Sequence, residues 1–199
     1  FTTMSLSDSG ISFLGVYSDG GEEVKITGQL GDYLYLGNNQ FIDTAANCES
    51  GFYYFDYGQY SCHRKDVSVD YDNGIINIEG RQLKKIGELE TGDSISSGYT
   101  GIWKGNMLDR GIPYTAYCFD KGDGTAVAVM EWAYNTAKGT PRYGTYVSTW
   151  IPDSESGKIK MNHGMFYEVE DGYHERTFYG TLSGDGNSIV TSSGTLVRQ

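Results

Sequence analysis

Short apolar stretches separated by tight-turn sequences run along the whole chain, and this pattern restricts it to β-structure. Val67–Tyr71 and Ile75–Ile78 flank Asp72-Asn73-Gly74, and Asn-Gly is among the strongest β-hairpin turn signals. A second hairpin is predicted over residues 114–134, around the turn Asp120–Gly124. Apolar residues do not recur at a 3.6-residue period in any window of helical length. The chain is therefore predicted to be all-β.

Composition and charge agree with a folded β-protein and exclude several classes of partner. The 199 residues include 28 Gly and 17 Tyr but only 3 Pro, which is typical of many short strands joined by tight turns and argues against collagen or disorder. The formal net charge of −11 disfavours phosphate backbones, so we expect no nucleic-acid partner. Without an apolar run of about 20 residues, membrane insertion is not expected.

A degenerate internal repeat indicates two β modules. Phe13-Leu14-Gly15-Val16-Tyr17 matches Tyr99-Thr100-Gly101-Ile102-Trp103 at a spacing of 86 residues. Tyr57-Gly58-Gln59-Tyr60 matches Tyr143-Gly144-Thr145-Tyr146 at the same spacing. Two separated blocks that agree on one spacing favour an internal duplication.

Further along the chain the spacing shortens to 83 residues, where Gly74-Ile75-Ile76 meets Gly157-Lys158-Ile159. A shorter loop in one copy accounts for this change. The sequence predicts a first, degenerate module over residues 1–90 and a second, larger module over residues 91–199. From Gly172 onward no counterpart is recognised, so these strands either enlarge the second module or complete a sheet that both modules share.

The second module resembles a known family. A Gly-x-Trp start at Gly101-Ile102-Trp103, an Asp-Gly-rich hairpin at Asp120–Thr125 and a Gly-x-Tyr strand at Gly144-Thr145-Tyr146 are similar to the lipocalin-like (calycin) β-barrel domains of secreted bacterial lipoproteins. The first module has Tyr17 in place of the Trp. The resemblance implies antiparallel up-and-down barrels, either packed or holding one small apolar ligand, in which Trp103 closes one end.

Aromatic residues on the predicted strands are the candidate ligand contacts. Alternation places Met130, Trp132 and Tyr134 on one face of their strand, and Tyr146 and Trp150 on one face of the next. If both faces point into one barrel, they form a rim of amphipathic aromatic side chains suited to a small apolar or sugar-like ligand. The alternative interpretation is that these residues only fill a small core.

Two of the three cysteines allow two interpretations. Cys48 and Cys62 flank an aromatic run, and they either form a disulfide in an oxidising compartment or remain buried thiols. Cys118 lies in a strand-like stretch and is predicted to be a core residue. No Cys-x-x-Cys pair supports a structural zinc site.

The sequence offers no recognisable catalytic constellation. His63, His163 and His174 lack the spacing of a local metal pair, and carboxylate pairs such as Glu168 and Glu170 are typical of a solvated strand face. We therefore predict no catalytic residues, no metal and no cofactor.

These observations favour a non-enzymatic β-barrel protein, extracellular or on the cell surface, that binds a small ligand or a protein surface. A first alternative is a structural or adhesive subunit that forms homo-oligomers or filaments through the polar N-terminal arm Phe1–Gly10. A second alternative is an enzyme built on a lipocalin-like barrel.

Overall fold

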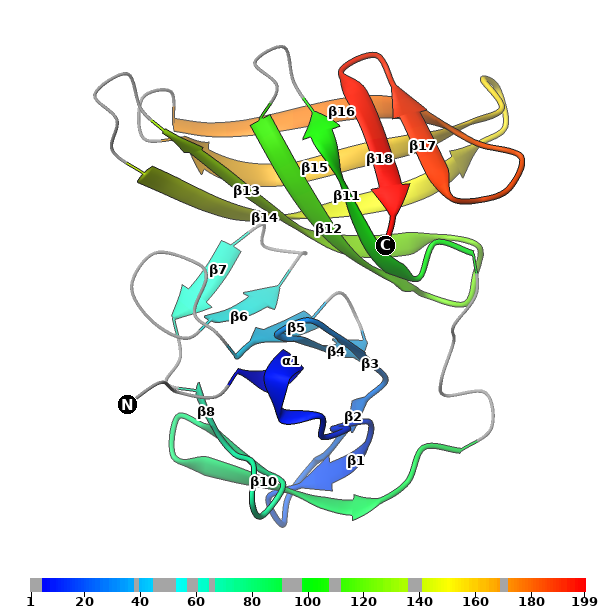
Figure 1. Cartoon of the computed structure of the whole chain (residues 1–199). Coiled ribbons are helices and arrows are strands. Elements are labelled where there is room, and N and C mark those ends of the chain that lie inside the picture. Colours follow the sequence, from blue (N-terminus) through cyan, green and yellow to red (C-terminus); the bar gives the residue numbers. More distant parts are fainter. Residues whose placement is uncertain are drawn as a thin grey trace. The chain divides into compact units, whose positions relative to one another are not determined.

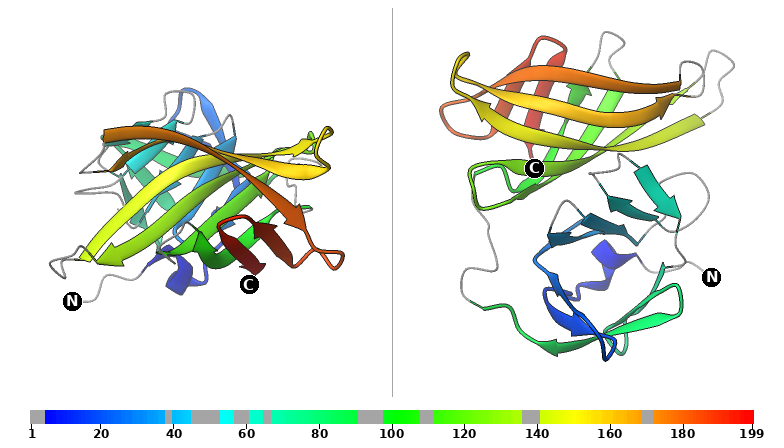
Figure 2. Two further views of the ribbon diagram at one scale, coloured as in Figure 1. Left: turned by 90° about the horizontal axis from the view of Figure 1, so that it is seen from above. Right: turned by 180° about the vertical axis from the view of Figure 1, so that it is seen from behind.

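The computed structural model is almost entirely β, which confirms the predicted fold class, and the chain divides into two compact units, Phe1–Ile95 and Ser96–Gln199 (Figures 1 and 2). Each unit is described separately below. The structure describes residues 5–37, 40–44, 53–56, 61–64, 67–90, 98–107, 112–135, 141–168 and 172–199.

The second unit is a closed antiparallel barrel in which consecutive strands are neighbours and the last strand pairs with the first. This eight-stranded meander is compatible with the lipocalin-like architecture. The barrel runs through β11 (Gly101–Met107), β12 (Ile112–Asp120), β13 (Ala126–Asn135), β14 (Pro141–Asp153), β15 (Lys158–Glu168), β16 (Gly172–Leu182), β17 (Ser188–Thr191) and β18 (Gly194–Arg198).

Local turn chemistry explains the barrel hairpins. Between β12 and β13 the Lys121 amide donates to the Thr125 carbonyl at 2.9 Å, and the Asp123 carboxylate accepts from the Thr125 amide at 2.9 Å. Gly122 and Gly124 have φ angles of 88° and 85° there, in the left-handed region that favours glycine. The predicted hairpin over residues 114–134 is thereby confirmed.

The first unit consists of two five-stranded antiparallel sheets, ordered β2-β1-β10-β9-β8 and β3-β4-β5-β6-β7. Among the described residues of this unit there is one short helix, α1, which lies between the sheets (Figure 1). The elements are α1 (Leu6–Ser9), β1 (Gly15–Ser18), β2 (Glu23–Ile26), β3 (Gly28–Leu30), β4 (Tyr33–Gly37), β5 (Gln40–Asp43), β6 (Tyr53–Asp56), β7 (Ser61–Arg64), β8 (Val67–Asp70), β9 (Ile75–Ile78) and β10 (Arg81–Gly87).

In both units most consecutive strands form antiparallel pairs and the last strand pairs with the first. Only Thr27 separates β2 from β3, and its amide continues the ladder by donating to the Tyr35 carbonyl at 2.9 Å. Two residues separate β7 from β8. The described strands of the first unit thus follow an up-and-down order within two sheets, whereas those of the second unit close into one barrel.

The first strands of the units also agree in register. Tyr17 on β1 pairs with Lys85 on the last strand, β10, just as Trp103 on β11 pairs with Arg198 on β18. Gly15 and Gly101, two residues before the aromatic side chains, have similar φ angles of 154° and 146°. The match between residues 13–17 and 99–103 therefore joins equivalent strands.

Of the other sequence matches, one falls partly outside the described residues and one joins turns at different places in the two strand orders. Residues 143–146 lie on β14, the fourth barrel strand, whereas residues 57–60 fall between β6 and β7 and outside the described residues. Gly74 lies in the turn after β8, near the end of its unit, whereas Gly157 lies in the turn after β14. Glycine and tyrosine recur in many hairpins, so such matches do not identify a particular hairpin.

The segment from Gly172 onward forms β16–β18, which complete the barrel of the second unit. In the first unit β8, β9 and β10 likewise come last along the chain, and β10 pairs with β1. The expectation that the segment from Gly172 onward has no counterpart stays a prediction. Duplication itself stays a prediction.

Candidate functional site

The barrel interior of the second unit is the candidate functional site, and two of its strands line it with small side chains. Alternate residues of β12 and β13 point inward and belong to the buried interior cluster. The interior of an eight-stranded barrel is just wide enough for side chains to fill. This wall combines four small inward side chains, those of Ala116, Cys118, Ala126 and Ala128, with the larger Tyr114 and Met130.

Trp150 on β14 lies beside this wall. Its indole carries a polar atom that has no hydrogen-bond partner among the described residues. Its backbone pairs with Ala126 on β13 and Met161 on β15, and its side chain is fully buried. Its ring makes edge-to-face contacts with Tyr99 and Trp103, at centroid distances of 6.1 and 6.0 Å. The buried Nε1 atom has no hydrogen-bond partner among the residues that the structure describes.

Trp103, by contrast, has its polar atom satisfied. Its Nε1 atom donates to the Tyr99 carbonyl at 3.0 Å, and the Arg198 guanidinium lies over its ring, 4.3 Å from the centroid. Arg198 also donates to the carbonyls of Thr100 and Gly98, at 2.7 and 2.6 Å. These contacts join the first and last barrel strands to the segment before β11, so Trp103 and Arg198 close this end of the barrel.

The structure describes the side chains of only some of the predicted ligand contacts. Met130 and Trp150 are both fully buried in the same interior cluster, and Trp150 lies in the interior rather than at a rim. The backbone of Tyr146 is the register partner of Met130. The side chains of Trp132, Tyr134 and Tyr146 lie outside the described part of the structure.

Sequence reasoning did not assign Tyr99 or the small wall residues to the site. The alternation Tyr114-x-Ala116-x-Cys118 carries the signal for the wall, because three inward positions in a row include two small side chains. Tyr99 precedes β11 and packs against the interior cluster from a loop, where strand alternation gives no information.

Cys118 is a free, fully buried thiol, as predicted for a core residue. Burial raises the pKa of this thiol well above its ordinary value, and the Asp120 carboxylate raises it further. The thiol is therefore protonated at neutral pH and a poor nucleophile. The Cys48 prediction falls outside the described residues, as does the side chain of Cys62.

Several aspartates support turns. Asp70 accepts from the Asn73 side chain at 2.8 Å, and Asp153 accepts from the Ser156 hydroxyl at 2.6 Å. These side-chain hydrogen bonds lower the pKa of both carboxyl groups. No group of three His, Cys, Asp or Glu residues suited to a metal occurs among the described residues, and the three histidine side chains are not among them.

Tyr17 on β1 has the same register position in the first unit as Trp103 has in the second. Its raised pKa predicts that stability depends on pH. Burial, with a smaller effect of the Glu88 carboxylate, raises its pKa to about 12. An unfolded tyrosine ionises near pH 10, so the folded chain holds this proton more tightly and stability falls as the pH rises between about 10 and 12. We expect a loss of about 2–3 kcal/mol across this window.

Urea denaturation of the wild-type protein and Tyr17→Phe from pH 9 to 12 measures this loss, because the variant has no phenol to ionise. The free energy of unfolding of the wild-type protein should fall relative to that of the variant. Parallel pH profiles would contradict the assignment.

Among the described residues, no helix is long and apolar enough to span a bilayer. Comparison with known proteins finds no match to the chain among protein-family models, curated proteins or solved structures.

Proposed function

We propose that the barrel of the second unit binds a small, largely apolar molecule that carries a hydrogen-bond acceptor. The observation that carries this proposal is the unpartnered Trp150 Nε1 atom in the barrel interior. An indole N–H can only donate, and a buried donor without an acceptor costs about 1–3 kcal/mol. A bound acceptor atom, such as a carbonyl or ether oxygen, removes this cost.

The described lining favours an apolar ligand over a sugar-like one. Met130, Met161, Ile159 and the partly buried Phe178 surround the same interior as Trp150. A sugar needs hydrogen-bond partners for most of its hydroxyl groups, and buried hydroxyls without partners are costly. A ligand with an apolar body and one acceptor suits this lining better.

Binding receives more support than the two alternative functions. The Cys118 thiol, the described nucleophilic group of the interior cluster, is held in its unreactive protonated form. The described part of the N-terminal arm packs on its own unit, since Leu6 is only 1% exposed in the first-unit core. An arm held in this way has less freedom to dock into a neighbouring molecule.

Two aromatic probes that differ at one group test the proposal. 2-Acetylnaphthalene carries a carbonyl acceptor, whereas 2-ethylnaphthalene is similar in shape but has none. We expect the ketone to bind the wild-type protein roughly 2–10-fold more tightly, as one neutral hydrogen bond allows. Trp150→Phe, which removes the donor, should abolish this preference. Quenching of tryptophan fluorescence gives both affinities.

Trp103→Phe is the matched control, because the Trp103 donor is already bonded to the Tyr99 carbonyl. This variant should keep the preference for the ketone. The proposal fails if neither probe binds, or if Trp150→Phe keeps the preference. Native mass spectrometry of protein purified from its host should in addition show a bound small molecule that denaturation releases.

A further inference from the structure

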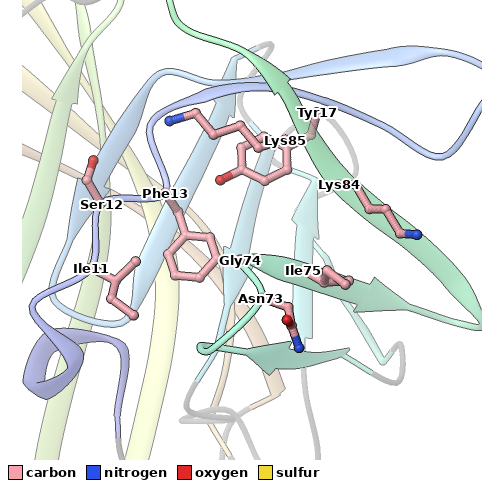
Figure 3. Close-up of a pocket in the computed structure, with 9 residues that line it drawn as sticks. All are labelled: Ile11, Ser12, Phe13, Tyr17, Asn73, Gly74, Ile75, Lys84 and Lys85. Carbon is pink, nitrogen blue, oxygen red and sulfur yellow. The ribbon is translucent and has the colours of Figure 1, made fainter.

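A surface pocket of about 500 Å³ lies wholly within the first unit (Figure 3). One wall is the segment Gly10–Leu14, called the strap below, which runs from α1 to β1. The opposite side consists of β1, the turn between β8 and β9, the start of β9, and β10. A volume of this size lies in the range of small-molecule sites.

The pocket joins an apolar surface to positive charge. The partly exposed side chains of Ile11 and Ile75 supply the apolar part and Lys85 supplies the charge, while Lys84 borders the pocket. No Asp or Glu is among the described residues that line it. This lining is exceptional for the first part of the chain, since residues 1–92 contain 6 basic and 14 acidic residues. The local chemistry is therefore that of a site for an anion with an apolar body.

The two lysines are not equivalent. Lys85 pairs in register with Tyr17, whereas Lys84 pairs with Ser18, and adjacent residues on a strand point to opposite faces. In Figure 3 the ammonium group of Lys85 extends on the same side as the Tyr17 ring and toward the strap, whereas that of Lys84 points away from both. Lys85 is thus the cation that an occupant of the pocket meets.

Glu88 would compete with a bound anion for Lys85. Its carboxylate pairs with the Lys85 ammonium at 2.8 Å, and its side chain is 81% exposed. Exposed ion pairs of this kind contribute little to stability, so a carboxylate held against the apolar wall can replace Glu88 at low cost.

The strap is held in place without any ligand. The Phe13 amide donates to Gln29 Oε1 at 2.7 Å, and Gln29 Nε2 donates to the Ile11 carbonyl at 2.9 Å. Phe13 is fully buried and makes an edge-to-face contact with Tyr71, with ring centroids 6.2 Å apart. The apolar wall is therefore formed in advance, and binding loses little entropy in ordering it.

We propose that this first-unit pocket binds a small organic carboxylate with an apolar body, whose carboxylate group pairs with Lys85. The site is separate from the barrel interior of the second unit and does not depend on the proposed function of that interior.

Titration calorimetry with 3-phenylpropionate, and with the neutral 3-phenylpropanamide as its isostere, tests this proposal on the full-length protein. The carboxylate should bind and the amide should bind at least 10-fold more weakly. Lys85→Met, which keeps the aliphatic stem, should weaken binding of the carboxylate by about 10-fold or more, as expected for a charge-assisted hydrogen bond.

Two further variants separate this role from a general charge effect. Lys84→Met removes the same charge from the adjacent position and should change affinity less than 2-fold to 3-fold. Glu88→Gln removes the competitor and should tighten binding by about 2–5-fold. The proposal is overturned if the amide binds as well as the carboxylate, if the two lysine variants lose affinity equally, or if 3-phenylpropionate does not bind.

Discussion

Replacing Gly105 by alanine is expected to prevent closure of the second-unit barrel. Gly105 on β11 pairs with Leu196 on β18, in the ladder that joins the first strand to the last. A Cβ atom at this position would overlap the carbonyl oxygen of Thr195 and lie 2.8 Å from its carbonyl carbon. Both are backbone atoms, so no side-chain rotation relieves the clash.

The expected loss is more than about 4 kcal/mol, a size reached only when backbone or core geometry is broken. Amide hydrogen exchange followed by mass spectrometry measures it separately for each unit, and protection should be lost in β11 and β18 but kept in β1 and β10. Gly184→Ala is the control, because a Cβ there meets no atom within 4 Å. If protection of β11 and β18 survives in Gly105→Ala, the closing register is wrong.

Removing the Arg198 side chain is expected to have the second-largest effect. Arg198 donates to the carbonyls of Gly98, Thr100 and Gly186 and covers the Trp103 ring. Hydrogen bonds from charged donors contribute about 1.5–3 kcal/mol each, and the cation–π contact adds roughly 0.5–1 kcal/mol. Since water replaces some of these contacts, we expect Arg198→Ala to lower the free energy of unfolding of the second unit by about 2–4 kcal/mol.

Arg81→Ala is the matched control, because it removes the same type of side chain from an exposed position. Arg81 pairs with Asp19 at 2.7 Å, but its side chain is 52% exposed, so the expected loss is at most about 1 kcal/mol. Urea denaturation of both variants gives the difference. Equal losses would show that Arg198 does not hold the barrel end together.

The local part of the fold could be predicted from the sequence, and the long-range part could not. Asp-Asn-Gly and Asp-Gly turns between alternating stretches identify hairpins, because turn chemistry depends on a few neighbouring residues. The pairing of Trp103 with Arg198 closes the barrel across 95 positions of sequence, and no local pattern encodes it. The repeat matched the first strands of the two units, which agree in register, but it also matched Gly74 with Gly157, which lie in turns at different places in the strand order, because Gly recurs at many hairpins.

In the candidate site, too, the local features could be predicted from the sequence and the long-range contacts could not. Alternation along one strand identified the inward position of Met130, and that of Trp150 on the next strand, since strand residues alternate between faces. Whether a buried donor finds an acceptor depends on every neighbour in space, so the unpartnered Nε1 atom of Trp150 had no sequence signal. The first-unit pocket likewise combines the strap, β1 and β10. These segments are far apart along the chain, so the sequence does not show that they lie together.

The most direct test of ligand binding in the barrel is the indole region of a ¹H–¹⁵N correlation spectrum. The chain has 3 tryptophans, so single Trp→Phe variants assign each indole N–H signal. Saturation with 2-acetylnaphthalene should move the Trp150 signal downfield, because its N–H gains an acceptor, and should move the Trp103 signal much less. A Trp150 signal that stays in place, or that moves equally with 2-ethylnaphthalene, would contradict the assignment of Trp150 as the anchor of a bound ligand.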